Sequence, residues 1–241
     1  MNDATVKLRV SGDYACFTRP ETKVERLSYD VPTPSAARGI LDAILWRPEM
    51  RWHIVKIAVL KPIRFQALKR NEVQSKLPVK GKTGVKAWME NPSAYRPQAA
   101  GAGSDDATPR NTLALRDVAY LIEAEPVVFD CGSSSDPNTP RKYKEMFDRR
   151  VLKGQCFHTP ALGCREFAAA FEMPHEGEKP IEESRDLGMM LYDIVFGPSG
   201  EANRPIFFRA RLESGILNTR AEDTFTDEAL CREVLTCSFK R

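Results

Sequence analysis

The residues best suited to chemistry on an anionic partner lie in one stretch, from Asn138 to Phe167. It begins with a dense set of cations on one short helix, led by Arg141 and Lys142, and continues to His158, which has a cysteine on either side. Cations on a helix attract an anionic polymer, and an imidazole close to them is suited to proton transfer. This stretch is therefore the first candidate for a functional site. The alternative is a solvated helix face with a bystander histidine.

A metal site is a second interpretation of the same stretch. Cys156, His158 and Cys164 could supply three zinc ligands, but their spacing matches no common zinc module, so no metal and no other cofactor is predicted. His53 falls in an expected strand, which favours a structural role. His175 falls in an acidic linker, which favours a solvated position. Phosphate-binding glycine loops, nucleophile elbows and the zinc-protease motif are missing from the sequence, so kinase, dehydrogenase and common hydrolase chemistry has no support.

The basic segment has the pattern of a capped amphipathic helix. Thr139 is the expected N-cap, Pro140 the first helical residue and Gly154 the stop. Residues recur at three- and four-residue steps, at Tyr143, Met146, Phe147, Arg150 and Val151, and the helix is expected to bury its aromatic and aliphatic stripe. The cations then fan out around this stripe, at Arg141, Lys142, Lys144, Arg149, Arg150 and Lys153.

The elements before and after this helix predict an α+β fold. Alternation over 6–10 and a β-rich run over 52–60 predict strands, and Thr33-Pro34 begins a helix that ends near Trp46. A strand over 113–129, the basic helix and a short strand over 164–171 complete a second β-α-β unit. This order predicts a ferredoxin-like domain, with two helices on one face of a four-stranded antiparallel sheet.

Two further segments complete the predicted organisation. Residues 63–110 form a long basic insertion, in part a β-hairpin and in part a loop. The strands Leu187–Phe196 and Ile206–Leu212, with a helix capped by Thr226 or Asp227 and running through Leu235, form a C-terminal extension. The expected domains are 1–172, with the insertion, and 173–241.

Charge is unevenly distributed, although the formal net charge of the 241-residue chain is only +3. Residues 56–86 hold nine Lys or Arg and one acid, whereas residues 172–186 hold six acids and two bases. This asymmetry favours a basic side that binds a polyanion and an acidic side that meets protein. The aromatic signature of sequence-reading RNA domains is missing, so contacts to phosphates through 56–86 and 141–153 are the better prediction. A solvated lysine-rich loop is the alternative.

Cysteine usage and the lack of long apolar runs in the sequence indicate a cellular compartment. The six cysteines form no CxxC pair, no signal peptide is visible and no apolar run approaches about twenty residues. These features predict a reduced, soluble, cytoplasmic protein without membrane contact.

Three blocks of the sequence carry a family resemblance: SGDYACFTRPETKVERLSYDVPTPSAARGILDAILWRP, NTLALRDVAYLIEAEPVVF and RKYKEMFDRRVLKGQCFHTPALGCREF. In this order, and with LYDIVF and FFRARLESGIL after them, they resemble the type I-C member of the fifth CRISPR-associated (Cas) protein family. The resemblance covers essentially the whole chain. It implies the ferredoxin-like fold known as the repeat-associated mysterious protein fold.

The resemblance also implies an activity and a set of partners. Such a protein cuts the repeat of CRISPR RNA without metal, by attack of a ribose 2′-OH on the adjacent phosphate, which leaves a cyclic phosphate. It then keeps the 5′ handle of the crRNA. The implied partners are the repeat RNA, the backbone and large subunits of the Cascade complex and, in the assembled complex, target DNA, in antiviral defence.

The site implied by the family matches this sequence only in part. Some relatives place a Tyr before the tryptophan of the first helix, where this chain has Leu45, and a Lys-His pair where it has Arg141-Lys142. The expected catalytic residues are Lys142, Arg141, Tyr143 and His158. The expected RNA-binding residues are Arg19, Lys23, Arg38, Lys61, Arg64, Arg70, Lys144, Arg149, Arg150, Lys153 and Arg165. The rival hypothesis is a non-catalytic RNA-binding cap of Cascade.

Overall fold

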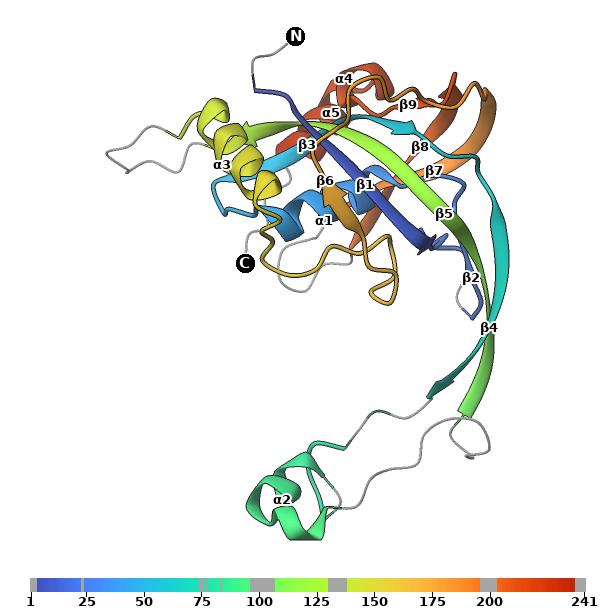
Figure 1. Ribbon diagram of the computed structural model, residues 1–241, viewed down its shortest axis with the longest axis vertical. Coiled ribbons are helices and arrows are strands. Elements are labelled where there is room, and N and C mark those ends of the chain that lie inside the picture. Colours follow the sequence, from blue (N-terminus) through green and yellow to red (C-terminus); the bar gives the residue numbers. More distant parts are fainter. Residues whose placement is uncertain are drawn as a thin grey trace.

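One long strand, β5 (Ala107–Val128), organises the molecule (Figure 1). The computed structural model describes residues 4–22, 24–73, 76, 78–82, 84–95, 107–129, 138–195 and 203–236. Within it, β5 pairs antiparallel with three strands and parallel with the short β2 (Arg26–Leu27). The antiparallel partners are β1 (Val6–Ala15), β3 (Met50–Val59) and β4 (Phe65–Val73). The strands predicted over 6–10 and 52–60 are thereby confirmed.

The sheet continues without a break into the C-terminal part of the chain. Its order is β6-β1-β5-β3-β9-β8-β7, and the strands outside the β5 group are β6 (Ala170–Glu172), β7 (Arg185–Val195), β8 (Arg204–Glu213) and β9 (Ile216–Asn218). The short β9 pairs with both β3 and β8, so it attaches the β7–β8 hairpin to the main sheet. The predicted α+β class and the C-terminal antiparallel hairpin are confirmed. The division into domains at residue 172 stays a prediction, and one sheet crosses it.

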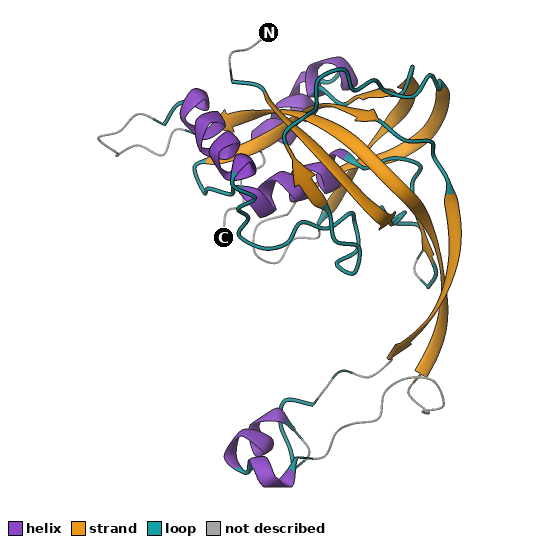
Figure 2. Ribbon diagram, in the orientation of Figure 1, coloured by secondary structure: helices purple, strands orange, loops and turns teal. Residues whose placement is uncertain are grey.

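The predicted insertion is a two-stranded arm. β4 pairs with the first part of β5 from Phe65↔Leu115 to Val73↔Ala107, and the arm extends away from the body (Figure 2). Beyond it lie the helix α2 (Val85–Glu90) and a short 3₁₀ turn, where the rings of Trp88 and Tyr95 meet edge to face at 4.8 Å. The hairpin is confirmed, and residues 96–106 of the insertion lie outside the described residues.

Two helices with the predicted N-caps pack against the sheet. In α1 (Pro34–Ile44) the hydroxyl of Thr33 accepts a hydrogen bond from the Ala36 amide at 3.1 Å. In α3 (Pro140–Leu152) Thr139 accepts from the Lys142 amide at 3.3 Å. The buried stripe of α3 includes Tyr143, Phe147 and Val151, and the helix is followed by Gly154 at φ +61°. The ring of Phe147 meets Trp52 of β3 at 5.0 Å, which joins α3 to the sheet.

The strand predicted over 164–171 is wrong in extent. Only Ala170–Glu172 pairs with β1 as β6, and the residues before it form a tight turn. In this turn the Leu162 amide donates to the Phe167 carbonyl at 2.7 Å and the Phe167 amide donates to Cys164 at 3.0 Å. The backbone groups that a strand would offer to a neighbour are therefore used locally.

The last described elements are two short helices, α4 (Ala221–Thr224) and α5 (Glu228–Thr236). The carboxylate of Asp227 accepts from the Ala229 amide at 2.8 Å, so Asp227 is the predicted cap that forms. Among the described residues, no helix has both the length and the apolar character needed to span a bilayer.

Phe147 and Phe157 offer a matched test of this packing. Phe147 is fully buried and Phe157 is 85% exposed, so the same substitution removes core contacts at one site and almost none at the other. We expect Phe147→Ala to lower the free energy of unfolding by about 3–5 kcal/mol. Phe157→Ala should change it by less than about 0.5 kcal/mol. Urea unfolding followed by circular dichroism measures both, and equal losses would contradict the assignment of Phe147 to the core.

Candidate nucleic-acid interface

The C-terminal end of α1 is the point where the candidate segments meet. Three consecutive carbonyls there accept hydrogen bonds from other parts of the chain. Ala43 accepts from the Phe157 amide at 2.7 Å, Ile44 from Nη1 of Arg150 at 2.6 Å, and Leu45 from the indole N–H of Trp52 at 2.9 Å. The last carbonyls of a helix have no partner within the helix, so these bonds satisfy them and fix α3, the 153–158 loop and β3 to the same end.

These bonds give Arg150 a structural role. Its guanidinium caps α1, and a cation at a helix C-terminus interacts favourably with the helix dipole. The sequence analysis predicts that Arg150 binds RNA. Its position inside this network suits it chiefly to holding α1 and α3 in place.

Three large apolar side chains are exposed around this helix end. Trp46 follows Leu45 directly and is 50% exposed, and Phe157 is 85% exposed although its amide is anchored to α1. Leu152, at the end of α3, is also exposed. Exposed aromatic rings among cations are the usual platform for unstacked bases. The sequence analysis assigned no role to either aromatic side chain. The available signal was that each follows closely after a predicted helix end.

The first turn of α3 holds two of the expected catalytic residues on its surface. Arg141 is exposed and pairs with Glu145 at 3.0 Å, a contact of small energetic value between two solvated groups. Lys142 is partly exposed, and no acidic residue lies in this turn. Cations at a helix N-terminus oppose the dipole, so an added anion would stabilise this turn.

Tyr143 is a core residue. It is 1% exposed, and its hydroxyl donates to Oε1 of Glu49 at 2.9 Å. A buried phenol that already donates its proton to a carboxylate is poorly placed to exchange it with a substrate. Sequence reasoning did not find Glu49, because 94 residues separate it from Tyr143.

His158 lies at the other end of α3 from Lys142. Its amide approaches the Ala43 carbonyl at 3.4 Å, close to where Arg150 reaches Ile44. Lys142 precedes Arg150 by eight residues, which is about 12 Å along a helix axis. The structure therefore does not bring Lys142 and His158 together.

His158 instead shares an open hollow with Arg165. The hollow has a volume of about 580 Å³ and is lined by Ala36 and Gly39 of α1 and by the loop residues His158, Thr159, Ala161, Gly163 and Arg165. A Cβ added at Gly39 would have no atom within 4 Å, so this face of α1 is open. An imidazole and a guanidinium on the wall of an open hollow can bind an anionic group.

The other expected RNA-binding cations fall into two groups. Several are engaged within the protein: Arg19 lies over the Tyr29 ring at 4.6 Å, Lys61 pairs with Asp117 at 2.5 Å, Arg70 with Glu166 at 2.6 Å, and Lys144 with Asp148 at 2.6 Å. Others are exposed and form no ion pair with another described residue: Arg64, Arg149, Lys153 and Arg165. Lys23 lies outside the described residues.

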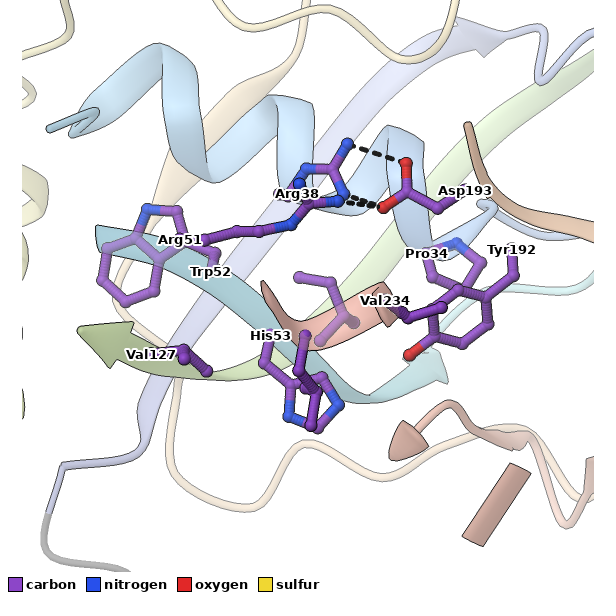
Figure 3. A pocket seen from close by; sticks show the side chains of 11 residues that line it. Pro34, Arg38, Arg51, Trp52, His53, Val127, Tyr192, Asp193 and Val234 are labelled. Carbon is purple, nitrogen blue, oxygen red and sulfur yellow. Dashed lines mark hydrogen bonds and ion pairs between the residues drawn. The ribbon is translucent and has the colours of Figure 1, made fainter. Parts of the chain in front are cut away.

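Arg38 belongs to a buried ion cluster (Figure 3). Its guanidinium binds both carboxylate oxygens of Asp193 on β7, and Arg51 of β3 binds the same carboxylate at 2.5 Å. The cavity beside the cluster holds only about 20 Å³, room for roughly one water. This position makes Arg38 a link between α1 and β7.

The pKa values of two carboxyl groups in this cluster are shifted in opposite directions. Burial raises the pKa of Asp42 to about 6, despite Arg38 at 3.8 Å. Burial also acts to raise the pKa of Asp193, but its hydrogen bond from Arg38 and the charges of Arg38 and Arg51 hold that pKa below the ordinary value. Asp193 is thus kept ionised and Asp42 is protonated easily.

No described residues form a group of three or more His, Cys, Asp or Glu side chains that could hold a metal ion. Cys156 is exposed in the loop after α3, and Cys164 is partly buried in the turn before β6. The structure thus offers no donor set for the zinc interpretation within the part that it describes.

The sequence is similar to one protein family over nearly its full length. Residues 5–220 match the family model described as CRISPR-associated protein (Cas_Cas5). A protein of Mannheimia succiniciproducens named CRISPR pre-crRNA endoribonuclease Cas5d is 46% identical over 220 residues, which cover 88% of this chain and 93% of the relative. A protein of the same name from Thermus thermophilus is 42% identical over 236 residues, covering 91% and 93%.

Solved structures share the fold. One, described as a CRISPR-associated protein, superposes with a TM-score of 0.61 at 23% identity and covers 94% of both chains. A functionally uncharacterized protein from Streptococcus mutans superposes with a TM-score of 0.60 at 20% identity, again over 94% of both. At such low identity these structures establish the architecture alone.

The ion cluster predicts a pH effect on stability. The folded pKa of Asp42 lies above the usual 3.8, so its contribution to stability is greatest below pH 4 and is lost as the pH rises through about 6. Asp42→Asn mimics the protonated form. We expect its free energy of unfolding, relative to the wild type, to gain about 2 kcal/mol between pH 4.5 and pH 8 in urea titrations.

Asp193→Asn is the matched control, and its expected effect on stability has the opposite sign to that of Asp42→Asn. The depressed pKa of Asp193 gives stability that is present above pH 4 and lost as the pH falls through its lower folded pKa. Its replacement removes the carboxylate that Arg38 and Arg51 share, so we expect a loss of about 3–5 kcal/mol at pH 8. A constant difference between Asp42→Asn and wild type at both pH values would contradict this account.

Proposed function

The chain belongs to the Cas5d family of CRISPR-associated proteins, and we propose that it cuts CRISPR precursor RNA in the repeat and keeps the 5′ handle bound. The observation that carries this proposal is the match to two proteins named pre-crRNA endoribonuclease, at 46% and 42% identity and over nearly all of each. The matches cover 88% and 91% of this chain, so they include the segments that hold the candidate interface.

The finer fold assignment belongs to the same proposal. β1, α1, β3, β5, α3 and β6 follow one another as β-α-β-β-α-β, and their strands lie in the order β6-β1-β5-β3. This succession is that of a ferredoxin-like domain, with the arm between β3 and β5 as an insertion. In this assignment the C-terminal ends of α1 and α3 meet beside the sheet, where the RNA would bind.

The RNA, in this proposal, crosses the C-terminal end of α1. Trp46 and Phe157 supply rings for unstacked bases, and Arg149 and Lys153 supply charge for phosphates. The hollow beside His158 and Arg165 takes a further nucleotide of the handle. Cations of the arm, including Lys69 and Arg64, would extend the basic path, and Cascade subunits and target DNA would meet other surfaces.

Cleavage takes place at the first turn of α3 in this proposal. Attack of a 2′-OH on the adjacent phosphate needs a base, a cation for the pentacoordinate phosphate and a proton for the leaving 5′ oxygen. Lys142 is partly exposed at a helix N-terminus, and the burial of Tyr143 and the distant position of His158 leave it as the best candidate for the phosphate. His158 then acts in handle binding.

A cleavage assay with purified protein and repeat RNA tests the activity. We expect cleavage in EDTA, with a cyclic phosphate on one product and a free 5′-OH on the other. Lys142→Ala should lower the rate by about 100-fold while the affinity for the cut handle stays nearly unchanged. Lys144→Ala, two residues along the same helix and paired with Asp148, is the control and should cleave normally. Intact RNA at excess wild-type protein, with binding retained, would favour the non-catalytic cap.

The aromatic platform predicts a separate loss of affinity. Phe157→Ala should weaken binding of handle RNA by about 1–3 kcal/mol, the value of one base stacked on an aromatic ring. Phe207→Ala, on the exposed side of β8, is the matched control and should bind as the wild type does. Fluorescence anisotropy with a labelled handle measures both. Equal affinity of Phe157→Ala and wild type would remove Phe157 from the RNA path.

A further inference from the structure

Two cysteines that are 148 residues apart in sequence lie side by side at the end of β1. The Cys16 amide donates to the Leu162 carbonyl at 3.0 Å, and the thiol of Cys164 approaches the Cys16 carbonyl at 3.7 Å. The hydroxyl of Thr18 lies 3.7 Å from the Cys16 sulfur and 3.8 Å from the Cys164 sulfur. Both thiols therefore surround one small polar group.

Gly163 makes this approach possible. It has φ +86°, and a Cβ at this position would lie 2.0 Å from the Cys16 carbonyl oxygen. The turn before β6 can therefore pack its backbone directly on the end of β1 only with glycine here. The two cysteines are held together by main-chain contacts, and their proximity does not depend on the thiols themselves.

The surroundings make the two thiols unequal. Nη1 of Arg26 lies 3.6 Å from the Cys164 sulfur, and Cys164 is partly exposed, whereas Cys16 is fully buried. The hydrogen bond from Cys16 lowers the pKa of Cys164, against the opposing effect of burial, and Thr18 and Arg26 lower it further. The same hydrogen bond and burial raise the pKa of Cys16.

One carboxylate faces this pair, and its charge is largely compensated. Glu166 opposes ionisation of Cys164, but it pairs with Arg26 at 2.8 Å and with Arg70 at 2.6 Å. The net arrangement is an accessible, ionisable sulfur beside a buried protonated one. This is the division of roles found where one cysteine reacts with an oxidant and a second resolves the product.

We propose that Cys164 and Cys16 are an oxidisable pair that forms a disulfide on reaction with a hydroperoxide. The Cys164 thiolate attacks the terminal hydroxyl oxygen of the hydroperoxide, the O–O bond breaks, and Cys164 becomes a sulfenic acid. The other oxygen leaves as hydroxide from hydrogen peroxide, or as alkoxide from an organic hydroperoxide. The thiol of Cys16 then loses its proton, its sulfur attacks the Cys164 sulfur, and the hydroxyl leaves as water. The two thiols lose two electrons in total, and the peroxide is reduced by two electrons.

The disulfide would tie the turn before β6 to the end of β1. That turn carries Gly163 and Arg165, which line the hollow beside His158. Oxidation would thus fix one wall of the hollow to the sheet. The thiol chemistry stands whether or not the hollow binds RNA.

Peptide mapping of the full-length protein under non-reducing conditions tests the proposal. After treatment with hydrogen peroxide and blocking of free thiols, we expect a Cys16–Cys164 cross-linked peptide in the wild type. Cys164→Ser should lose it, and Cys16→Ser should leave a sulfenic acid at Cys164 that dimedone traps. Cys156→Ser, at an exposed cysteine outside the pair, is the control and should form the cross-link as the wild type does.

A second measurement needs no cysteine variant. A brief pulse of iodoacetamide on the native, reduced wild type should label Cys164 and leave Cys16 unlabelled, and the peroxide-treated protein should lose the Cys164 label in parallel with cross-link formation. The proposal is overturned if peroxide converts Cys164 to a sulfinic acid without any cross-link, or if Cys164 is unreactive in the native protein.

Discussion

The end of α1 imposes the constraint on which the rest of the candidate interface depends. Its last carbonyls must find donors outside the helix, and a buried carbonyl without one costs about 1–3 kcal/mol. Arg150, Phe157 and Trp52 supply these donors from α3, the following loop and β3. Because all three come from different segments, satisfying the helix end also fixes where those segments lie. The exposed rings of Trp46 and Phe157 face solvent as a consequence.

A second interaction joins the N-terminal and C-terminal parts of the chain. Asp193 on β7 accepts from Arg38 of α1 and Arg51 of β3, and β9 extends the sheet from β3 to β8. Burying these charges is tolerable because each oxygen of Asp193 has a guanidinium partner. The C-terminal hairpin is thus attached to α1 by a specific ion cluster as well as by backbone pairing, which orients α1 and the interface at its end.

Sequence patterns were sufficient where the decisive contacts are local. The caps at Thr33, Thr139 and Asp227, the alternation in β1 and the hairpin of the insertion follow from residues a few positions apart, and the structure confirms them. The family resemblance from three blocks is confirmed as well. The strand expected over 164–171 was wrong because its amides bond within a turn instead of to a neighbour. The contacts of Tyr143 with Glu49, Arg150 with Ile44 and Arg38 with Asp193 join residues about a hundred or more positions apart, and no local pattern encodes them.

The central claim is that repeat RNA crosses the end of α1 with its scissile phosphate at the first turn of α3. A structure of the protein with repeat RNA that carries a 2′-deoxy nucleotide at the cleavage position would test it most directly, because such RNA binds but cannot be cut. The account predicts the amine of Lys142 about 3 Å from the phosphate after the deoxyribose, with a base stacked on Trp46 or Phe157. RNA bound along the β4–β5 arm alone, with the end of α1 exposed to solvent, would contradict it.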